Sequence, residues 1–321
     1  MTGRTLVVFV TRRLAALGLL LLLVSFLVFT LLFLAPGSPE QVLLGTNPSS
    51  PEVIKSLRAQ HHLDDSFLEQ YWFWLSGALR FDFGDSIRTG RPVLSSLGSR
   101  LGVTLFLGAY AFVVSLVVGV SLGVLAAVRR RGLADRGAVA LSVLGASAPA
   151  FVSGVFLLYV FAVALGWFPS YGDGTGVADR LWHLTLPAAA LSLTAIALIV
   201  KLTRAAMITA LEQDYVAFAL ARGVPARRVI LRHALRNALV PVVTGAGLVL
   251  TVVLTGAVLV EVTFSLPGLG TLLVDAVNNK DLPMLQGVAM VFAAVIVIVN
   301  LLVDILYAAV DPRIRVGQEA R

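Results

Sequence analysis

The stretch Glu212–Pro241, EQDYVAFALARGVPARRVILRHALRNALVP, lies between two long apolar segments and carries five arginines against two acidic residues. Asp214–Arg222 is rich in helix-forming residues, Gly223 suits the position just after a helix, and Pro225 suits the first position of the next. The pattern predicts two short helices separated by a break. We interpret this basic connection as a docking site for another protein; a solvated loop that contacts anionic lipid headgroups is the alternative.

The second half of this stretch predicts a helix with two distinct faces. Arg228, Arg232 and Arg236 recur at a spacing of four residues, which predicts a basic row along one face. The residues expected on the other face are Val229, Ile230, His233, Ala234 and Asn237. A helix of this kind could fit a groove on a partner.

The composition is that of a membrane protein. Of the 321 residues, 58% are hydrophobic and 13% are charged, and the mean hydropathy is +0.91. Such values favour a polytopic membrane protein over a soluble enzyme. The net charge of +7 could indicate nucleic acid, but basic cytoplasmic loops explain it more simply, so we expect no nucleic-acid partner. Without cysteine, the chain forms neither a disulfide nor a thiolate metal site.

Long uncharged segments predict an all-α fold with six transmembrane helices in the lipid bilayer. The first, Leu14–Ala35, is long enough to cross a bilayer and exceeds the apolar region of a cleavable signal peptide. The polar region 36–100 follows, with short helices expected at Pro51–Gln60 and His61–Arg80. Pro149 is expected to kink the third span. The later spans are expected at about Leu101–Val128, Gly137–Gly172 with an interfacial tail, Leu184–Val200, Ala238–Val260 and Leu282–Tyr307.

Region 36–100 contains two local features. The aromatic run Tyr71–Trp74 is interpreted as an interfacial anchor rather than a binding surface. Asp82-Phe83-Gly84 matches the metal-binding triplet of protein kinases in spelling only, because no glycine-rich loop or His-Arg-Asp loop accompanies it.

The distribution of basic residues predicts the orientation. Six spans place both termini on one side of the membrane, together with the 129–136 loop and the 201–236 region. That side carries 17 of the 25 Lys and Arg residues. The positive-inside rule therefore predicts cytoplasmic termini and a cytoplasmic Glu212–Pro241 stretch.

The spans contain few ionisable residues, which argues against a proton-coupled carrier. The charged residues expected near span ends, where they can reach the interface, are Lys201, Arg204, Glu261 and Asp304. Small and polar residues at helical spacing favour close helix packing. The alternative, which assigns them a function, is that they line a pore. The possible pore-lining residues are Ser142, Ser153, Thr244, Thr251, Thr255 and Asn300.

No catalytic or metal-binding set emerges from the motifs. The four histidines are scattered, and adjacent His61 and His62 cannot share one helical face as metal ligands do at i and i+4. No nucleophile elbow and no His-Glu-x-x-His motif occurs. No lysine follows a glycine as in a Walker phosphate loop, so we expect that this chain does not hydrolyse nucleotide by itself.

The Glu212–Pro241 stretch resembles the coupling loop of the inner-membrane permeases of dipeptide/oligopeptide and nickel ABC importers. The motifs within the loop are Asp214-Tyr215-Val216, Ala221-Arg222-Gly223, Arg227-Arg228-Val229 and His233-Ala234-Leu235-Arg236-Asn237-Ala238-Leu239-Val240-Pro241. The resemblance runs almost end to end. Motifs elsewhere are Leu34-Ala35-Pro36-Gly37, Leu63-Asp64-Asp65, Gln70-Tyr71, Asp82-Phe83-Gly84-Asp85-Ser86, Arg91-Pro92-Val93, Glu261-Val262-Thr263-Phe264-Ser265-Leu266-Pro267-Gly268-Leu269-Gly270, Asn300-Leu301-Leu302-Val303-Asp304 and Tyr307-Ala308-Ala309-Val310-Asp311-Pro312-Arg313-Ile314-Arg315.

The resemblance implies a type I ABC importer permease of the bacterial plasma (inner) membrane, forming half of a pore for di- or oligopeptides. Residues 1–35 would hold the N-terminal tail and first span, and residues 36–100 an extracytoplasmic loop region. Residues 101–321 would form the permease core, with a cytoplasmic coupling loop at about 206–240. An ATP-independent secondary transporter or channel is the alternative.

The implied partners are a second, homologous permease in a heterodimer, two cytoplasmic ATP-binding subunits and an extracytoplasmic substrate-binding protein. ATP and Mg would be held by the ATP-binding subunits, and this chain would carry no cofactor, metal or catalytic residue. The implied coupling residues are Ala217, Ala219, Ala221, Arg222, Gly223, Val224, Pro225, Arg227 and Arg228. The family's loop begins with Glu-Ala-Ala where this chain has Ala217-Phe218-Ala219, which removes an acidic contact at position 217.

Overall fold

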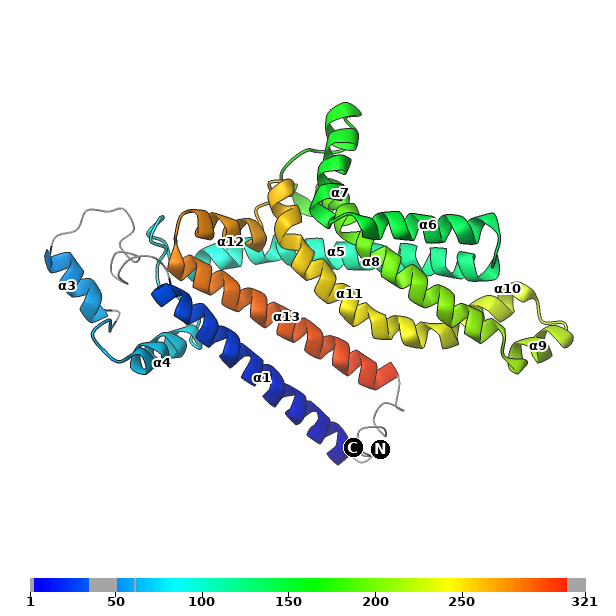
Figure 1. The fold of residues 1–321 in the computed structure, drawn as a ribbon, viewed down its shortest axis with the longest axis horizontal. Helices are drawn as coiled ribbons and strands as arrows, with labels where there is room; N and C mark the ends of the chain where they lie inside the picture. The colour runs from blue at the N-terminus through cyan, green and yellow to red at the C-terminus, as the bar shows by residue number, and fades with distance from the viewer. Residues whose placement is uncertain (1–2, 35–50, 61, 311–321) are drawn as a thin grey trace. The chain divides into compact units, whose positions relative to one another are not determined.

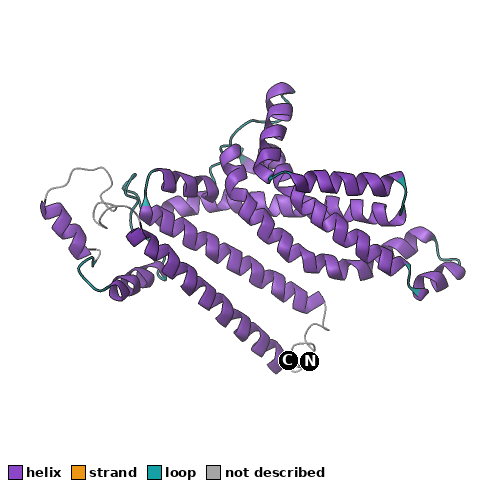
Figure 2. Cartoon of the chain, viewed as in Figure 1, coloured by secondary structure: helices purple, strands orange, loops and turns teal. Residues whose placement is uncertain are grey.

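A computed structural model describes residues 3–34, 51–60 and 62–310 of the chain (Figure 1). Over these residues the regular secondary structure is helical, apart from one isolated β-bridge between Asp85 and Pro92 (Figure 2). The prediction of an all-α fold is therefore confirmed. The motif residues 35–37 and 311–315 lie outside the described residues.

The chain divides into two compact units, an N-terminal unit of residues 1–103 and 267–301 and a core unit of residues 104–266 and 302–321. The N-terminal unit contains α1 (Gly3–Leu34), α3 (Pro51–Gln60), α4 (Phe67–Ala78), α12 (Leu269–Asn278), the start of α5 (Val93–Val128) and most of α13 (Leu282–Val310). The core unit contains the rest of α5 and α13, with α6 (Leu133–Ser147), α7 (Ala150–Leu157), π-helix η1 (Leu158–Ala164), α8 (Gly176–Leu211), α9 (Asp214–Ala221), α10 (Ala226–Arg228), π-helix η2 (Val229–Ala234) and α11 (Leu235–Thr263).

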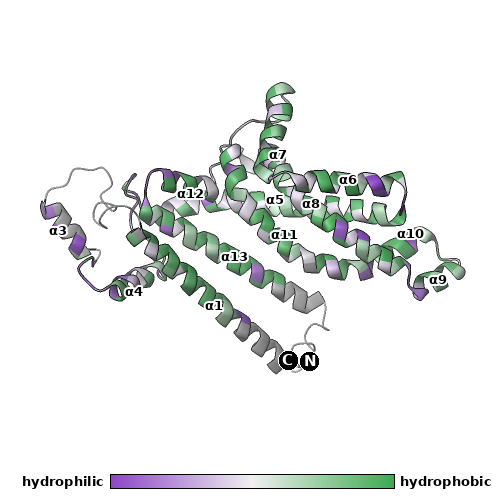
Figure 3. Ribbon diagram, viewed as in Figure 1, coloured by the Kyte–Doolittle hydropathy of each residue, from purple (hydrophilic) through white to green (hydrophobic). Residues whose placement is uncertain are grey.

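Among the residues that the structure describes, five helices are long and apolar enough to cross a membrane, namely α1, α5, α8, α11 and α13 (Figure 3). A further candidate span is the pair formed by α6 with α7–η1, which is bent by 102°. If this bent pair crosses the membrane once, the described residues carry the six predicted spans.

The bend follows from Pro149. Ala148, the residue before the proline, has extended backbone angles (φ −109°, ψ 138°), because the pyrrolidine ring disfavours the helical region for its predecessor. Helix α6 therefore ends at Ser147, and the Pro149 carbonyl accepts the backbone N–H groups of Val152 and Ser153 to start α7. The predicted kink is confirmed, and it is a full break between two helices.

Aromatic side chains hold α4 against α1 in the N-terminal unit. The Phe29 ring lies 5.5 Å from that of Tyr71 and 5.7 Å from that of Trp74, centroid to centroid. The Tyr71 hydroxyl lies 2.7 Å from Ser25 Oγ. Trp72 and Phe73 are exposed. The predicted aromatic run thus divides by helical periodicity into a packed pair and an exposed pair.

A capping interaction fixes the start of α4. The backbone N–H and the hydroxyl of Ser66 both donate to Glu69 Oε2, at 2.9 and 2.8 Å. Hydrogen bonds to the charged form of a carboxyl favour that form, so the Ser66 side chain and then its backbone lower the pKa of Glu69. Helix α4 therefore begins later than the segment His61–Arg80 predicts.

Buried Asp281 ties the 84–92 hairpin to the start of α13. Asp281 accepts hydrogen bonds from Ser86 Oγ at 2.5 Å, from Ile87 N at 3.2 Å and from Met284 N at 3.3 Å. The Asp82 carboxylate accepts the Gly84 N–H at 3.0 Å. The Asp82-Phe83-Gly84 triplet therefore begins a turn, and Phe83 is buried.

The core unit is built on close contact between α5 and α8. A Cβ atom added at Gly123 would lie 2.5 Å from Thr203 Cβ, and one at Gly119 would lie 2.6 Å from Ile199 Cγ2. Helix interfaces in membranes use such small residues because they let backbones approach. Helix α8 also packs against α6, α7 and α11, so it is the central helix of the unit.

We expect Gly123→Val to destabilise the core unit by about 1–3 kcal/mol, because a side chain there must displace Thr203. The matched control is Gly137→Val, since nothing lies within 4 Å of a Cβ at Gly137. The measurement is the thermal unfolding midpoint of detergent-purified protein. Equal midpoints for the two variants would contradict this account of α5–α8 packing.

Candidate docking site

The connection from α8 to α11, residues 212–234, folds into short helices as predicted; we call it the docking loop. It contains α9, α10 and η2, and Figure 1 shows α9 and α10 beyond the ends of α8 and α11 in the core unit. Helix α8 ends at Leu211, where the Glu212 N–H donates to the Ile208 carbonyl. Extended Gln213 then turns the chain into α9.

Gly223 ends α9 as the sequence predicts. Its φ of +78° lies in the left-handed region that glycine adopts readily. The Gly223 N–H donates to the Leu220 carbonyl at 2.9 Å, and the Val224 N–H donates to the Ala219 carbonyl at 3.1 Å. This pair of bonds is the Schellman motif. It defines the direction in which the chain leaves α9.

The second half of the docking loop differs from the prediction in register. Pro225 caps α10 rather than occupying its first position, and its carbonyl accepts the N–H groups of Arg228 and Val229. The next turn is π-helical from Val229 to Ala234, so the α-helical spacing assumed for the two faces fails there. Of the residues predicted for the face opposite the basic row, His233 and Asn237 are exposed.

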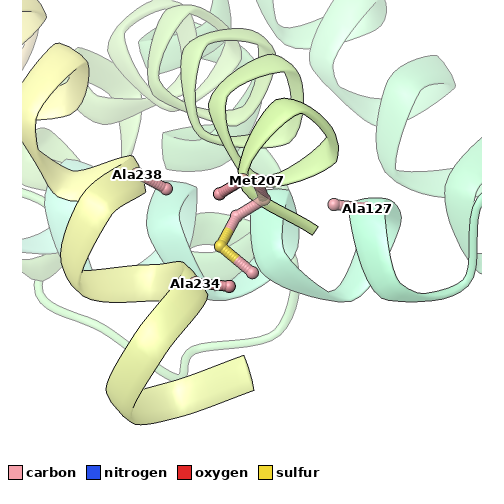
Figure 4. Packing of buried hydrophobic residues seen from close by; sticks show 5 residues of the cluster. Ala127, Met207, Ala234 and Ala238 are labelled. Atoms are coloured by element: carbon pink, nitrogen blue, oxygen red, sulfur yellow. The ribbon is translucent and has the colours of Figure 1, made fainter. Parts of the chain in front are cut away.

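The root of the docking loop is a buried cluster that joins four elements. Met207 of α8 contacts Ala234 of η2, Ala238 of α11 and Ala127 at the end of α5 (Figure 4). Met207 and Ala234 are 0% exposed. Because protein interiors are close-packed and transmit strain, a displacement of this root moves all four elements together.

Side-chain contacts also hold α9 in place above this root. Val216 is buried, and Asn237 Nδ2 donates to the Tyr215 hydroxyl at 2.9 Å. Glu212, at the end of α8, pairs with Arg130 at 2.5 Å. Further along α9, four residues are exposed, namely Ala217, Phe218, Leu220 and Ala221.

Most of the predicted docking residues are exposed. The exposed ones are Ala217, Ala221, Arg222, Gly223, Pro225, Arg227 and Arg228. Ala219 and Val224 are half-buried. The structure adds Phe218, whose side chain is 70% exposed on α9. The sequence could have indicated Phe218, because it is a large aromatic residue between the small residues Ala217 and Ala219.

The docking loop therefore exposes both the aromatic ring of Phe218 and several arginine side chains. Aromatic residues and arginine are the types enriched at protein interfaces, and short helices commonly dock in partner grooves. Within the described residues, no three His, Cys, Asp or Glu side chains gather as a metal site would require. The docking loop is therefore suited to a protein contact.

The possible pore-lining residues are distributed over both units. Thr255 of α11 is exposed and bonds to the Thr251 carbonyl at 2.9 Å, one turn earlier. Thr251 and Ser153 are half-buried, and so is Asn300 in the N-terminal unit. The side chain of Thr244 lies outside the described part of the chain.

Ser142 is buried, unlike the other possible pore-lining residues whose side chains the structure describes. Its side chain is 2% exposed, and its hydroxyl donates to the Ala138 carbonyl at 2.7 Å. A hydroxyl that is buried and bonded to its own helix does not line an open surface. In this conformation Ser142 is a packing residue of α6.

Two charged residues expected near span ends have hydrogen-bond partners within the core unit. Arg204 binds Asp135 of α6 through two hydrogen bonds, with Nε–Oδ1 at 2.6 Å and Nη2–Oδ2 at 2.9 Å. Glu261 is 0% exposed and accepts the Thr104 hydroxyl at 2.7 Å. Each partner is distant in sequence, so local patterns do not reveal the pairing. Lys201 is exposed, as expected.

Most of the chain matches two known families of membrane transport components. Residues 119–316 match the family described as the binding-protein-dependent transport system inner membrane component. Residues 6–108 match the N-terminal region of such membrane components.

Three relatives are similar over almost their whole length. A probable peptide ABC transporter permease of Sinorhizobium fredii is 39% identical over 96% of this chain and 99% of its own length. A glutathione transport system permease of Escherichia coli strain K12 is 39% identical over 96% of this chain and 98% of its own. A putative peptide permease of Brucella ovis is 41% identical, covering 95% and 98%.

A solved structure shows the same fold. An inward-facing MetNI methionine ABC transporter matches with a TM-score of 0.57 at 17% identity, over 67% of this chain and 96% of that chain. At this identity the likeness concerns the fold alone.

Proposed function

The chain belongs to the family of binding-protein-dependent transport system inner membrane components, and on that premise we propose that it imports di- or oligopeptides with ATP-binding subunits docked on residues 212–234. As a permease subunit of a binding-protein-dependent importer, it is a multi-pass membrane protein. The peptide cargo is supported by the names of the relatives, two of which are peptide permeases and one a glutathione permease. Glutathione is itself a short peptide.

The docking of an ATP-binding subunit is carried by one observation. The docking loop is an ordered structure that exposes Phe218 at 70% and also exposes Arg222, Arg227 and Arg228, while its root is buried between α5, α8 and α11. An aromatic ring and arginines on a rigid support are typical of the anchor residues of interfaces. Phe218 offers an apolar anchor in a loop that lacks the family's acidic residue at position 217. The positive-inside count supports a cytoplasmic position for this loop and for both termini.

The other subunits and the pore-lining residues are proposed on the same premise of family membership. A second, homologous permease completes the pore in a heterodimer, and an extracytoplasmic binding protein delivers the peptide to the side that carries residues 36–100. Thr251, Thr255, Ser153, Thr244 and Asn300 remain our proposed pore-lining residues. An ATP-independent carrier or channel does not agree with membership of a binding-protein-dependent family.

Coupling then follows from the attachment of the docking loop. Closure of two ATP-binding subunits displaces α9 and α10, and the close-packed root around Met207 passes that displacement to α8 and α11. Inverting a population of about 99:1 between inward-open and outward-open states requires about 5.5 kcal/mol of differential binding. ATP binding to two partner subunits supplies the difference between the two states.

We expect Phe218→Ala to weaken association of the ATP-binding subunits by about 2 kcal/mol, the loss typical of an interface anchor. The second permease, the ATP-binding subunits and the binding protein are taken from the neighbouring reading frames. Association is measured by co-purification, and uptake by ATP-loaded vesicles supplied with binding protein and peptide. Phe81→Ala is the matched control, because Phe81 is 65% exposed in the other unit.

Normal co-purification of the Phe218→Ala variant would contradict the docking of an ATPase on α9. The function itself is tested with the wild-type complex in the same vesicles. Uptake that follows an ion gradient without ATP would overturn it.

A further inference from the structure

The ion pair between Asp135 and Arg204 links α6 to α8 close to the docking loop. Arg204 lies on α8 seven residues before its last residue, Leu211, and Asp135 lies in the first turn of α6. The two side chains share two hydrogen bonds, of 2.6 and 2.9 Å. Figure 1 shows α6 and α8 side by side, and the two helices pack together. The pair thus joins the helix that enters the docking loop to one outside it.

The local structure holds Asp135 in one orientation. The α5–α6 turn closes by a hydrogen bond from the Gly132 N–H to the Arg129 carbonyl at 2.9 Å. Arg131 adopts a left-handed φ of +64°, and its N–H donates to Asp135 Oδ2 at 2.9 Å. The Asp135 side chain is 7% exposed. A bidentate guanidinium–carboxylate pair fixes geometry as well as adding energy.

Stability alone is a poor explanation for this pair. Taking two charges out of water offsets much of their attraction, and apolar residues of similar size often stabilise such a position equally well. What apolar residues do not reproduce is a fixed geometry between the two helices. The ion pair therefore fixes the position of α6 along α8, which we call the registry of the two helices.

The registry matters because α6 has no direct chain connection to the docking loop. Helices α8 and α11 run directly into the loop, and displacement of the loop moves them through the backbone. Helix α6 begins at the α5–α6 turn and ends at the Pro149 break. A loop displacement therefore reaches α6 and this break through side-chain contacts with α8.

We propose that Asp135 is a positioning residue for transport, which acts through Arg204 to make α6 follow α8 when the docking loop moves. This inference rests on the proposed function, since it requires ATP-binding subunits that displace the loop. Without the pair, the complex assembles and hydrolyses ATP, but displacement of the docking loop does not move α6. Opening of the pore is then no longer coupled to ATP hydrolysis.

The test separates positioning from stability by comparing one single and one double variant. Asp135→Asn keeps the size and the acceptor for the Arg131 N–H but leaves the guanidinium without its charged partner. Asp135→Asn/Arg204→Met removes both charges and is expected to restore stability, because no half-buried charge is left without its partner. Arg136→Gln is the control, since Arg136 is exposed on the same turn of α6.

The readouts are thermal stability, co-purification of the ATP-binding subunits, and peptide uptake per ATP hydrolysed in vesicles. For both Asp135 variants we expect retained co-purification and about tenfold less uptake per ATP, within the usual range of coupling between sites. The double variant recovers thermal stability but not uptake per ATP. Arg136→Gln behaves as wild type.

Recovery of uptake per ATP in the double variant, or normal coupling in Asp135→Asn, would overturn the positioning role and leave the proposed function standing. Failure of the wild-type chain to co-purify with ATP-binding subunits would overturn the proposed function, and the inference with it.

Discussion

Reversing the charge of both Arg227 and Arg228 to glutamate is expected to abolish association of the ATP-binding subunits and peptide uptake, while the chain still inserts into membranes. Both side chains are exposed at the start of the second half of the docking loop, so the substitutions leave the buried root intact. A partner surface that complements arginine carries negative potential, and like charges across an interface cost on the order of several kcal/mol.

The measurement is co-purification of the tagged ATP-binding subunits from detergent-solubilised membranes, with membrane yield of the permease as the folding check. Association of the wild-type complex should also weaken as ionic strength rises, because exposed charges are screened. Arg80→Glu/Arg88→Glu makes the same change of charge at exposed positions of the N-terminal unit, and it should leave association unchanged. Full association of the Arg227→Glu/Arg228→Glu variant would refute a docking surface on α10.

Gly223→Val is expected to eliminate uptake through the shape of the docking loop rather than through its charge. Gly223 has φ +78°, while no atom lies within 4 Å of an added Cβ. Any loss therefore comes from backbone conformation, which costs about 1–2 kcal/mol for an L-residue and more for a β-branched one. Relief of that strain turns α10 away from its position relative to α9.

Gly223→Asn is the matched control, because asparagine tolerates the left-handed region better than other side chains. We expect it to retain most uptake and association, with Gly223→Ala intermediate. Uptake is measured in ATP-loaded vesicles, and association by co-purification as above. Equal activities of the valine and asparagine variants would show that the backbone angle at position 223 does not control docking.

In the docking loop, the local sequence predicts some of the secondary structure correctly and some of it wrongly. Helix formers from Asp214 onward followed by Gly223 predict a helix that ends in the left-handed position, because both signals act within a few residues. The prediction is right for α9 and for the bond pattern that closes it. It fails for Val229–Ala234, which is π-helical and packs Ala234 in one buried cluster with Met207 of α8.

Region 267–281 also contains structure that local sequence patterns do not predict. The sequence predicts no element there, yet Leu269–Asn278 forms α12, with Leu269, Leu272 and Ala276 buried. A ten-residue amphipathic helix is marginal by itself in water, and tertiary packing stabilises it. Asp281, which follows α12, bonds to Ser86 far earlier in the chain, and no periodicity indicates such a contact.

Features that depend on neighbours along the chain could therefore be predicted from the amino acids alone. They are the helical class, the apolar spans, the break at Pro149, the cap at Gly223 and the cationic character of the docking loop. Contacts between distant residues were decided by the tertiary structure. Asp135 with Arg204, Thr104 with Glu261, and Met207 with Ala234 meet only after the helices pack. Backbone propensity and hydropathy act over one or two turns, whereas the pairing of charges and the burial of a methionine depend on which helices become neighbours.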